Sequence, residues 1–248
     1  MAMMADGAAG GTASGTARSA RHGAANGAAN GAANGANGAN GANGAVLLDK
    51  DGTLLVNVPY NVDPAQIRLA PTAGKALRRL GRLGLPLLVV SNQPGVALGR
   101  FRREALEGVR TRLAQLFVRY DARLAGFFYC PHHPQGSVPA YARACLCRKP
   151  APGMLRFAAA TLGFDLQSSW MIGDILDDVE AGRAAGCRTI LVDCCNETEW
   201  RPGPLREPHH VVSTLDAAAR IVEAATVTAR AGARAAGRRA QAVAEMSS

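Results

Sequence analysis

The chain has 248 residues, which is enough for one medium-sized domain or two small ones. Its formal charge of +9 fits an enzyme that handles phosphorylated substrates, and it fits a weak nucleic-acid binder equally well. No run of residues approaches the ~18 consecutive apolar positions of a membrane span. We expect no secretory signal, because no basic region followed by an apolar core opens the chain. The six cysteines are therefore expected to be thiols or metal ligands of a cytoplasmic protein rather than disulfides.

The two ends of the chain differ in composition from the middle. Residues 1–44 are almost entirely Ala, Gly, Asn, Ser and Thr, with a degenerate Gly-Ala-Asn repeat. They lack the large apolar side chains that could offset the entropy of ordering them, so we expect a disordered head. Residues 226–248 are rich in Ala and Arg, and we expect a solvated tail that is helical at most in part. The folded domain is predicted to span residues 45–225.

Within that domain, segments with the character of strands and helices alternate. Short apolar runs predict strands at residues 46–48, 85–90, 126–129, 170–172, 189–192 and 209–212. Apolar residues at helical spacing predict helices at residues 71–83, 103–119, 153–162, 177–185 and 214–224. This alternation indicates one α/β domain with a Rossmann-like parallel sheet. In such a sheet, ligands bind at the carboxyl ends of the strands.

The first predicted strand runs into two aspartates, Asp49 and Asp51, which are followed by Gly52 and Thr53. Residues two apart in a strand point to the same face, so the two acids would leave the strand together. Gly52 lets the chain turn away sharply. Such a pair can hold a hard divalent cation and leave one acid to attack or to carry protons. Taken singly, the pattern is also that of a strand ending in a polar turn, because turns collect aspartates.

Three further loops bring polar groups to the same edge of the predicted sheet. Residues 91–95, Ser-Asn-Gln-Pro-Gly, offer a hydroxyl, amides and backbone N–H groups suited to phosphate oxygens. Arg148 and Lys149 can neutralise phosphate charge. Residues 173–178 add carboxylates after a glycine. Each loop has a plain structural explanation, such as a helix N-cap, but the four together indicate a site for phosphate chemistry.

The order of these loops resembles the haloacid dehalogenase superfamily of phosphohydrolases over roughly residues 45–225. The resemblance implies that superfamily's fold without a large cap domain, with Asp49 as the nucleophile and Asp51 as the general acid and base. It implies that Ser91 and Lys149 bind the phosphoryl group. It also implies a Mg²⁺ site made by the Asp49 carboxylate, the Asp51 backbone carbonyl and Asp174. The chemistry requires in-line attack, a metal that offsets anion–anion repulsion and donors around the equatorial oxygens. Asp51 would need a raised pKa to serve as an acid near neutral pH.

A Cys- and His-bearing insert follows the third predicted strand. It contains Cys130, His132, Cys145 and Cys147. Three thiolates and one imidazole form a closed tetrahedral Zn²⁺ site of the structural kind. The resemblance implies His132 rather than His133 as the ligand, although the spacing permits either. The other cysteines lack this spacing and are expected to be ordinary thiols: Cys187, Cys194 and Cys195.

The residues around this insert, 129–136 and 147–150, are similar to the branch of the superfamily that removes the 7-phosphate of D-glycero-D-manno-heptose 1,7-bisphosphate. The similarity implies a small phosphorylated sugar as substrate, with Arg148 recognising groups beyond the reacting phosphate. The residues implied to contact substrate are Asn57, Val58, Pro59, Tyr60, Asn92, Gln93, Pro94 and Arg148.

One residue departs from that branch. Ile175 follows Asp174, where the branch usually has a basic residue, although Asp178 falls where the superfamily has its second acid. A histidinol-phosphate phosphatase, or another phosphatase of small metabolites, therefore stays open as an alternative.

We expect a monomer that uses Mg²⁺ and a structural Zn²⁺, with neither membrane nor nucleic acid as a partner. A non-catalytic protein that bound nucleic acid through its basic ends is the alternative from another class. Such a protein would have no need to keep together the five residues of the predicted site, Asp49, Asp51, Ser91, Lys149 and Asp174.

Overall fold

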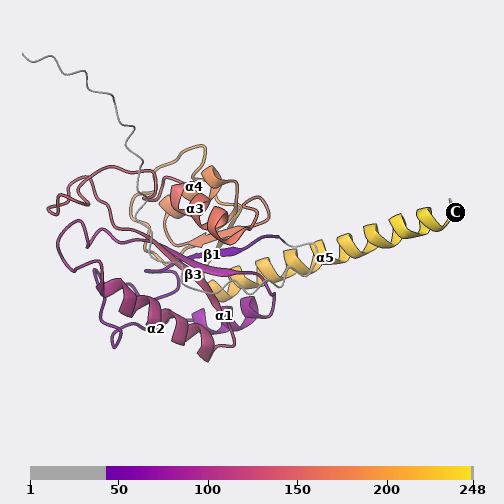
Figure 1. Ribbon diagram of the computed structural model, residues 1–248, viewed down its shortest axis with the longest axis horizontal. Helices are drawn as coiled ribbons and strands as arrows, with labels where there is room; N and C mark the ends of the chain where they lie inside the picture. The colour runs from indigo at the N-terminus through magenta and orange to yellow at the C-terminus, as the bar shows by residue number, and fades with distance from the viewer. Residues whose placement is uncertain (1–42, 247–248) are drawn as a thin grey trace, which may run out of the picture.

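The computed structural model of the protein describes residues 43–246, so the predicted disorder of the head concerns residues almost wholly outside the described part. Within that part, six strands form one parallel sheet in the order β3-β2-β1-β4-β5-β6 (Figure 1). The strands are β1 (Val46–Asp49), β2 (Leu87–Asn92), β3 (Leu124–Cys130), β4 (Trp170–Gly173), β5 (Arg188–Val192) and β6 (His210–Val212). The helices are α1 (Ala73–Gly81), α2 (Ala105–Arg119), α3 (Gly153–Leu162), α4 (Leu176–Ala185) and α5 (Leu215–Met246). The predicted α/β architecture is confirmed, and residues 43–246 contain no separate cap domain.

Strand β1 lies at the centre of the sheet, and its sequence explains why. Val46, Leu47 and Leu48 are completely buried, since β1 pairs with β2 on one side and with β4 on the other. Alternate residues point to opposite faces of the sheet, so Val46 and Leu48 join one hydrophobic cluster and Leu47 joins the other. A strand buried on both faces requires such a continuous apolar run. Asp49 therefore ends the strand at the middle of the sheet's carboxyl edge.

Helices cover both faces of the sheet. Side chains of α1, α2 and α5 pack in the cluster on one face, and those of α3 and α4 pack in the cluster on the other. Figure 1 shows these two layers on opposite sides of β1 and β3. Because all the paired strands are parallel, the loops that follow them gather at one edge between the layers.

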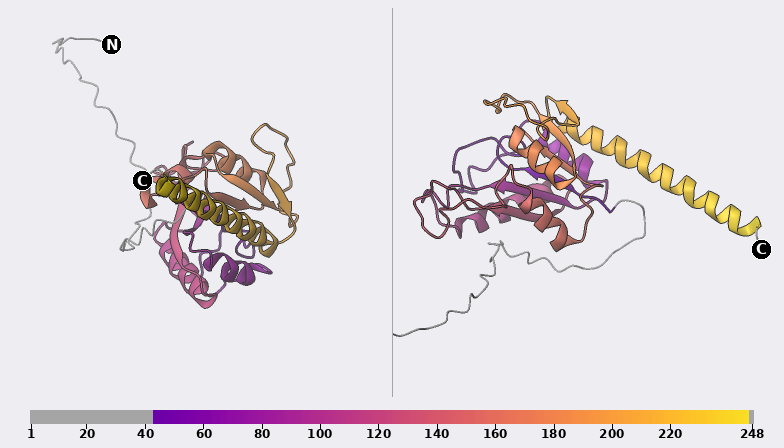
Figure 2. Two further views of the ribbon diagram at one scale, coloured as in Figure 1. Left: turned by 90° about the vertical axis from the view of Figure 1, so that its right-hand side faces the viewer. Right: turned by 90° about the horizontal axis from the view of Figure 1, so that it is seen from above.

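Helix α5 is much longer than predicted, so the prediction of a tail that is helical at most in part is wrong. The helix continues to Met246 and projects away from the domain (Figure 2). Its first turns are anchored by buried residues such as Leu215 and Val222. From Val227 to Arg238 every side chain except that of Arg230 is exposed. Alanine and arginine are strong helix formers, so this composition continues the helix without a packed face.

Strand β2 begins and ends two residues later than the predicted strand at 85–90, and this changes the place of two site residues. The apolar run ends at Val90, but pairing with β3 continues through Ser91 and Asn92. Backbone hydrogen bonds between strands do not require apolar side chains, so the ladder outlasts the hydrophobic pattern. Ser91 and Asn92 thus belong to the end of a strand rather than to the loop after it.

Helix α1 begins later than predicted, after Thr72, whose φ of 68° is not helical.

The part of the chain that the structure describes contains no helix both long and apolar enough to span a bilayer.

Removing residues 227–248 is expected to leave the domain folded, because the described side chains of this stretch are mostly exposed. We expect the melting temperature to change by less than roughly 3 °C, which is about 1 kcal/mol for a domain of this size. As a control, Val222→Ala, in the packed part of α5, should cost about 2 kcal/mol. Thermal melts followed by circular dichroism measure both. A large loss of stability on truncation would mean that the projecting helix contributes to the packed domain.

Candidate active site

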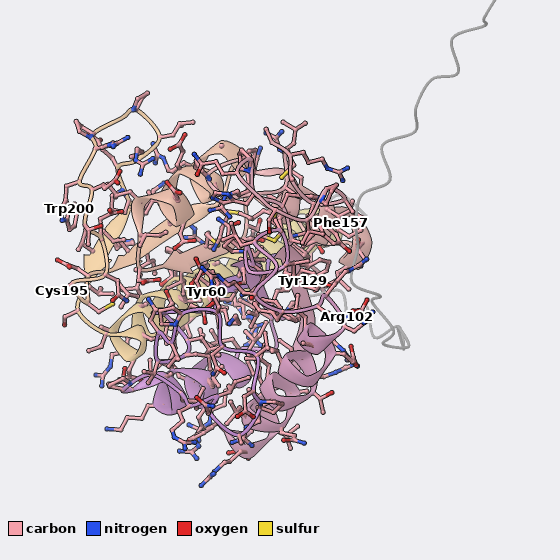
Figure 3. The ribbon with its side chains drawn as sticks, turned by 90° about the vertical axis from the view of Figure 1, so that its left-hand side faces the viewer. Tyr60, Arg102, Tyr129, Phe157, Cys195 and Trp200 are labelled. Atoms are coloured by element: carbon pink, nitrogen blue, oxygen red, sulfur yellow. The ribbon has the colours of Figure 1, made fainter. Side chains whose placement is uncertain are left out.

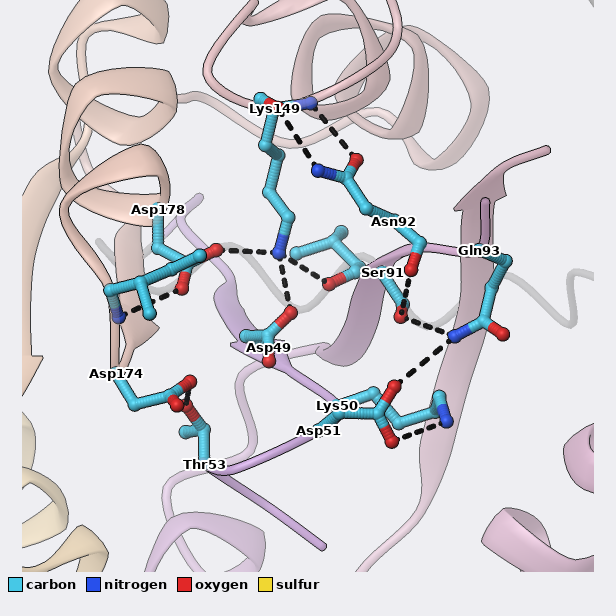
Figure 4. A network of polar contacts seen from close by, with 12 residues as sticks. Asp49, Lys50, Asp51, Thr53, Ser91, Asn92, Gln93, Lys149, Asp174 and Asp178 are labelled. Carbon is cyan, nitrogen blue, oxygen red and sulfur yellow. Dashed lines mark hydrogen bonds and ion pairs between the residues drawn. The ribbon is translucent and has the colours of Figure 1, made fainter. Parts of the chain in front are cut away.

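Asp49 lies in a network of buried charges at the carboxyl edge of the sheet (Figure 4). Lys149 Nζ donates to Asp49 Oδ1 at 2.5 Å, to Asp178 Oδ1 at 2.5 Å and to the Val90 carbonyl at 3.2 Å. Burial by itself would lower the pKa of Lys149, but the charges of Asp178 and Asp49 outweigh it and the pKa is raised. Lys149 therefore stays a cation and is fixed between two acids.

Asp174, the residue after β4, is the third buried acid of this network. Its Oδ1 accepts a hydrogen bond from Thr53 Oγ1 at 2.7 Å, and its Oδ2 accepts one from Asn196 Nδ2 at 2.7 Å. Burial, and then the charge of Asp49, raise the pKa of Asp174 to about 6. Carboxylate oxygens of Asp49, Asp174 and Asp178 lie within 4.8 Å of one another.

The donor set of this cluster fits Mg²⁺, which prefers hard oxygen ligands. Three buried carboxylates face one lysine, so the cluster carries excess negative charge. Burial raises the pKa of Asp178, Lys149 lowers it, and Asp49 and Asp174 raise it further. A divalent cation held by these oxygens would relieve the repulsion between them. Asp49 and Asp174, both predicted ligands, are brought together here.

Asp51 lies beside the cluster and faces different partners. Its Oδ1 accepts from Lys50 Nζ at 2.6 Å, and its Oδ2 accepts from Gln93 Nε2 at 3.3 Å. Burial is the main cause that raises the pKa of Asp51, and the charge of Lys50 opposes it. The direction of this shift is the one that an acid catalyst near neutral pH needs. The Asp51 side chain is therefore not part of the cluster of three carboxylates. This is consistent with the prediction that Asp51 contributes only its backbone carbonyl to the metal site.

The predicted phosphate-binding residues at the end of β2 are linked to this network. Gln93 Nε2 donates to Ser91 Oγ at 2.8 Å, and Ser91 is buried. Asn92 uses both ends of its amide on the backbone of Lys149, donating to its carbonyl at 2.9 Å and accepting from its N–H at 3.0 Å. Asn92 thus fixes the segment that carries Lys149. Pro94, next along the chain, is half-buried.

The other predicted substrate contacts lie farther out. Arg148 has a buried Nη1 without a hydrogen-bond partner among the described residues, which suits an anionic ligand. The stretch 57–60, with Asn57, Val58, Pro59 and Tyr60, is exposed. Figure 3 shows Tyr60 near the middle of the face formed by the loops. The guanidinium carbon of Arg100 lies 5.7 Å from the centre of the Tyr60 ring.

Three residues of the network were not singled out from the sequence. Thr53 belongs to the Asp-Gly-Thr stretch, so its position directly after the two aspartates could have indicated that its hydroxyl lies in the site. Lys50 is buried next to Asp51, although its place in a polar turn predicts exposure. Asn196 comes from the loop after β5, and nothing in its local sequence connects it with Asp174.

The four predicted zinc ligands also meet. Sγ–Sγ distances among Cys130, Cys145 and Cys147 are 3.3–3.5 Å, and His132 Nδ1 lies 3.7 Å from Cys130 Sγ and 3.4 Å from Cys147 Sγ. A tetrahedron with Zn–S bonds of about 2.3 Å has edges of about 3.8 Å, so this donor set fits Zn²⁺. His133 is not among the clustered residues, and its Nδ1 accepts from the Gln135 N–H at 3.2 Å. The geometry thus favours His132.

Comparisons with known proteins agree with this site. A family model described as "HAD-hyrolase-like", for haloacid dehalogenase-like hydrolases, matches residues 146–218. The D-glycero-beta-D-manno-heptose-1,7-bisphosphate 7-phosphatase of Escherichia coli (strain K12) is 39% identical over 148 residues, which are 60% of this chain and 78% of that protein.

Two solved structures extend the similarity to three dimensions. A HAD-like phosphatase from Mesorhizobium loti is 34% identical and has a TM-score of 0.65, covering 75% of this chain and 87% of that chain. The D,D-heptose 1,7-bisphosphate phosphatase from B. bronchiseptica, complexed with magnesium and phosphate, is 27% identical and has a TM-score of 0.60, covering 72% of this chain and 97% of that chain. These relatives are phosphatases by name.

Replacing Cys145 by Ser is expected to abolish zinc binding and destabilise the fold more than it affects the chemistry, because Zn²⁺ at these four side chains would join the two ends of a long loop. We expect a loss of more than about 2 kcal/mol, or roughly 5 °C in melting temperature. Metal analysis and thermal melts measure these quantities. Cys195→Ser, at an exposed cysteine outside the cluster, is the matched control. Full zinc content and an unchanged melting temperature in the Cys145 variant would refute a structural zinc site.

Proposed function

The chain belongs to the haloacid dehalogenase-like family of phosphatases, and we propose that it removes the 7-phosphate of D-glycero-D-manno-heptose 1,7-bisphosphate through an aspartyl-phosphate intermediate. The proposal for the reaction rests on one observation above all, the position of Asp49 between Lys149 and the other buried acids. The proposal for the sugar rests on the 39% identity to a heptose bisphosphate phosphatase. The phosphatase domain would comprise residues 45–225.

The first step joins Asp49 to the substrate. Lys149 holds Oδ1 of Asp49, and the second carboxylate oxygen would attack phosphorus in line with the bond to the sugar oxygen. As that bond breaks, Asp51 would give its proton to the departing sugar oxygen. The raised pKa of Asp51 supports this role, because the carboxyl group must be protonated when the substrate arrives.

The second step releases phosphate. Asp51, now a carboxylate, would take a proton from a water molecule whose oxygen attacks phosphorus. The bond between phosphorus and Asp49 breaks, which restores the Asp49 carboxylate and yields inorganic phosphate. The hydrogen bond from Gln93 and the ion pair with Lys50 orient Asp51 in both steps.

Charge on the phosphoryl oxygens would be balanced by groups already at the site. Lys149 and the Ser91 hydroxyl are the residues that would bind these oxygens. Mg²⁺, held by Asp49, Asp174 and the backbone carbonyl of Asp51, would offset the repulsion between the phosphate and the nucleophile. Asn92 acts indirectly, because its amide fixes the backbone of Lys149. Zn²⁺ would hold the insert that leads into Arg148 and Lys149.

Recognition of the rest of the substrate would fall to Arg148 and to the exposed stretch 57–60. The unpartnered Nη1 of Arg148 supports a contact with a second anionic group, such as the other phosphate of a bisphosphate. We further propose a monomeric enzyme of the cytoplasm, where cysteine ligands stay reduced.

A second candidate, histidinol phosphate, is favoured by one feature of the chain. Ile175 adds no cation next to Asp174, where the branch that acts on heptose bisphosphates usually has one. A substrate with one phosphate makes less demand on positive charge at this edge of the sheet. The aspartate chemistry would be the same for both substrates.

The proposed substrate is tested by phosphate release with Mg²⁺ from both anomers of heptose 1,7-bisphosphate, histidinol phosphate and several sugar monophosphates. We expect kcat/KM for one heptose anomer to exceed that for every other compound by about 100-fold or more, because polar groups built for one sugar remain unpaired with another. A profile led by histidinol phosphate, or one without preference, would retain the phosphatase chemistry and reject the heptose assignment.

A further inference from the structure

The loop that follows β5 reaches back to the candidate active site. Residues 193–197 follow the end of β5 and bend at Cys194 and Cys195, and Cys195 has a φ of 67°. We call these residues the β5 strap. Figure 3 shows Cys195, together with Trp200 farther along the same loop, at the left edge of the face formed by the loops. The strap contacts three elements of the site, through Cys194, Asn196 and Glu197.

Asn196 makes the central contact. Its Nδ2 donates one hydrogen bond to Asp174 Oδ2 at 2.7 Å and one to Cys194 Sγ at 3.2 Å. An amide nitrogen has two N–H groups, so both are used. The Cys194 thiol in turn donates to the Gly52 carbonyl at 3.6 Å. The contact with Cys194 therefore fixes the Asn196 amide in the position from which it donates to Asp174.

The approach of the strap is close enough to require glycine on the opposite side. A Cβ at Gly52 would lie 2.1 Å from Asp174 Oδ2 and 2.4 Å from Asn196 Nδ2. Gly52 also has a φ of 92°, which side chains rarely adopt. The turn after β1, the acid after β4 and the strap after β5 thus meet at one point.

Glu197 anchors the strap to a rigid element. Its Oε2 accepts from the Leu176 N–H at 2.6 Å, at the first residue of α4. A carboxylate at a helix N-terminus is favoured by the unpaired N–H groups and the helix dipole. Since α4 also carries Asp178, the strap is tied to the same helix as one of the three acids.

We propose that Asn196 is a positioning residue that, together with Thr53, holds Asp174 in the orientation in which its carboxylate can share a divalent cation with that of Asp49. This inference rests on the proposed function, because it assigns the cluster to Mg²⁺. Thr53 fixes Oδ1 and Asn196 fixes Oδ2, and each oxygen keeps a further lone pair for the metal. Removing a partner that orients a metal ligand typically weakens metal binding 10- to 100-fold.

The test uses the full-length, zinc-loaded protein and titrates Mg²⁺ by calorimetry in the absence of substrate. Asn196→Leu keeps the size of the side chain and removes the donor, and Asn196→Ala removes both. We expect both variants to bind Mg²⁺ about 10- to 100-fold more weakly, with melting temperatures close to that of the natural protein. Glu199→Gln, at an exposed position on the same loop, should bind Mg²⁺ as the natural protein does.

Turnover gives an independent readout. With p-nitrophenyl phosphate as substrate, the Asn196 variants should require a correspondingly higher Mg²⁺ concentration for half-maximal rate and should regain most of kcat at saturating Mg²⁺. Mg²⁺ affinity within twofold of the natural value in both variants would overturn the assignment of Asn196. Normal Mg²⁺ binding by the natural protein without hydrolysis of any sugar phosphate would overturn the proposed function and leave the role of Asn196 intact.

Discussion

The structure of the site depends on one buried cation, Lys149, held between Asp49 and Asp178. Two carboxylates at this depth repel each other, and the ammonium group 2.5 Å from both offsets part of that repulsion. Removing one partner of such a buried pair typically costs roughly 3–5 kcal/mol, because the remaining charge is left without compensation. The same contact holds one carboxylate oxygen of Asp49, the residue that we propose as the nucleophile. Stability and chemistry therefore share one interaction.

The parallel sheet makes this arrangement possible. β1 ends at Asp49, its neighbours β2 and β4 lead to Ser91 and Asp174, and residues far apart in the chain meet at one edge. Lys149 comes from the insert between β3 and α3, and the amide of Asn92 holds its backbone. The rigid elements thus supply the positions, and the loops supply most of the charges.

Much of the fold was predictable, since apolar runs and helical spacing identify each strand and helix of the domain. The extent of α5 was not, because a projecting helix of Ala and Arg has no apolar face to mark it. At the edge of the sheet, the convergence of Asp49, Ser91 and Asp174 follows from their places at or just after the carboxyl ends of neighbouring parallel strands, and Lys149 joins them from the insert between β3 and α3. The hydrogen bond from Asn196 could not be predicted, because it depends on how a loop 22 residues away folds back. The roles implied for the exposed stretch 57–60 remain predictions.

The central claim is that Asp49 becomes phosphorylated during turnover. The most direct measurement is rapid acid quench during hydrolysis of heptose 1,7-bisphosphate, followed by borohydride reduction and mass spectrometry of the peptide that contains residue 49. The account predicts that Asp49 is reduced to homoserine, as an acyl phosphate would be, and that Asn at this position abolishes both the label and turnover. Continued turnover with an unmodified Asp49, or a label on another residue, would contradict it.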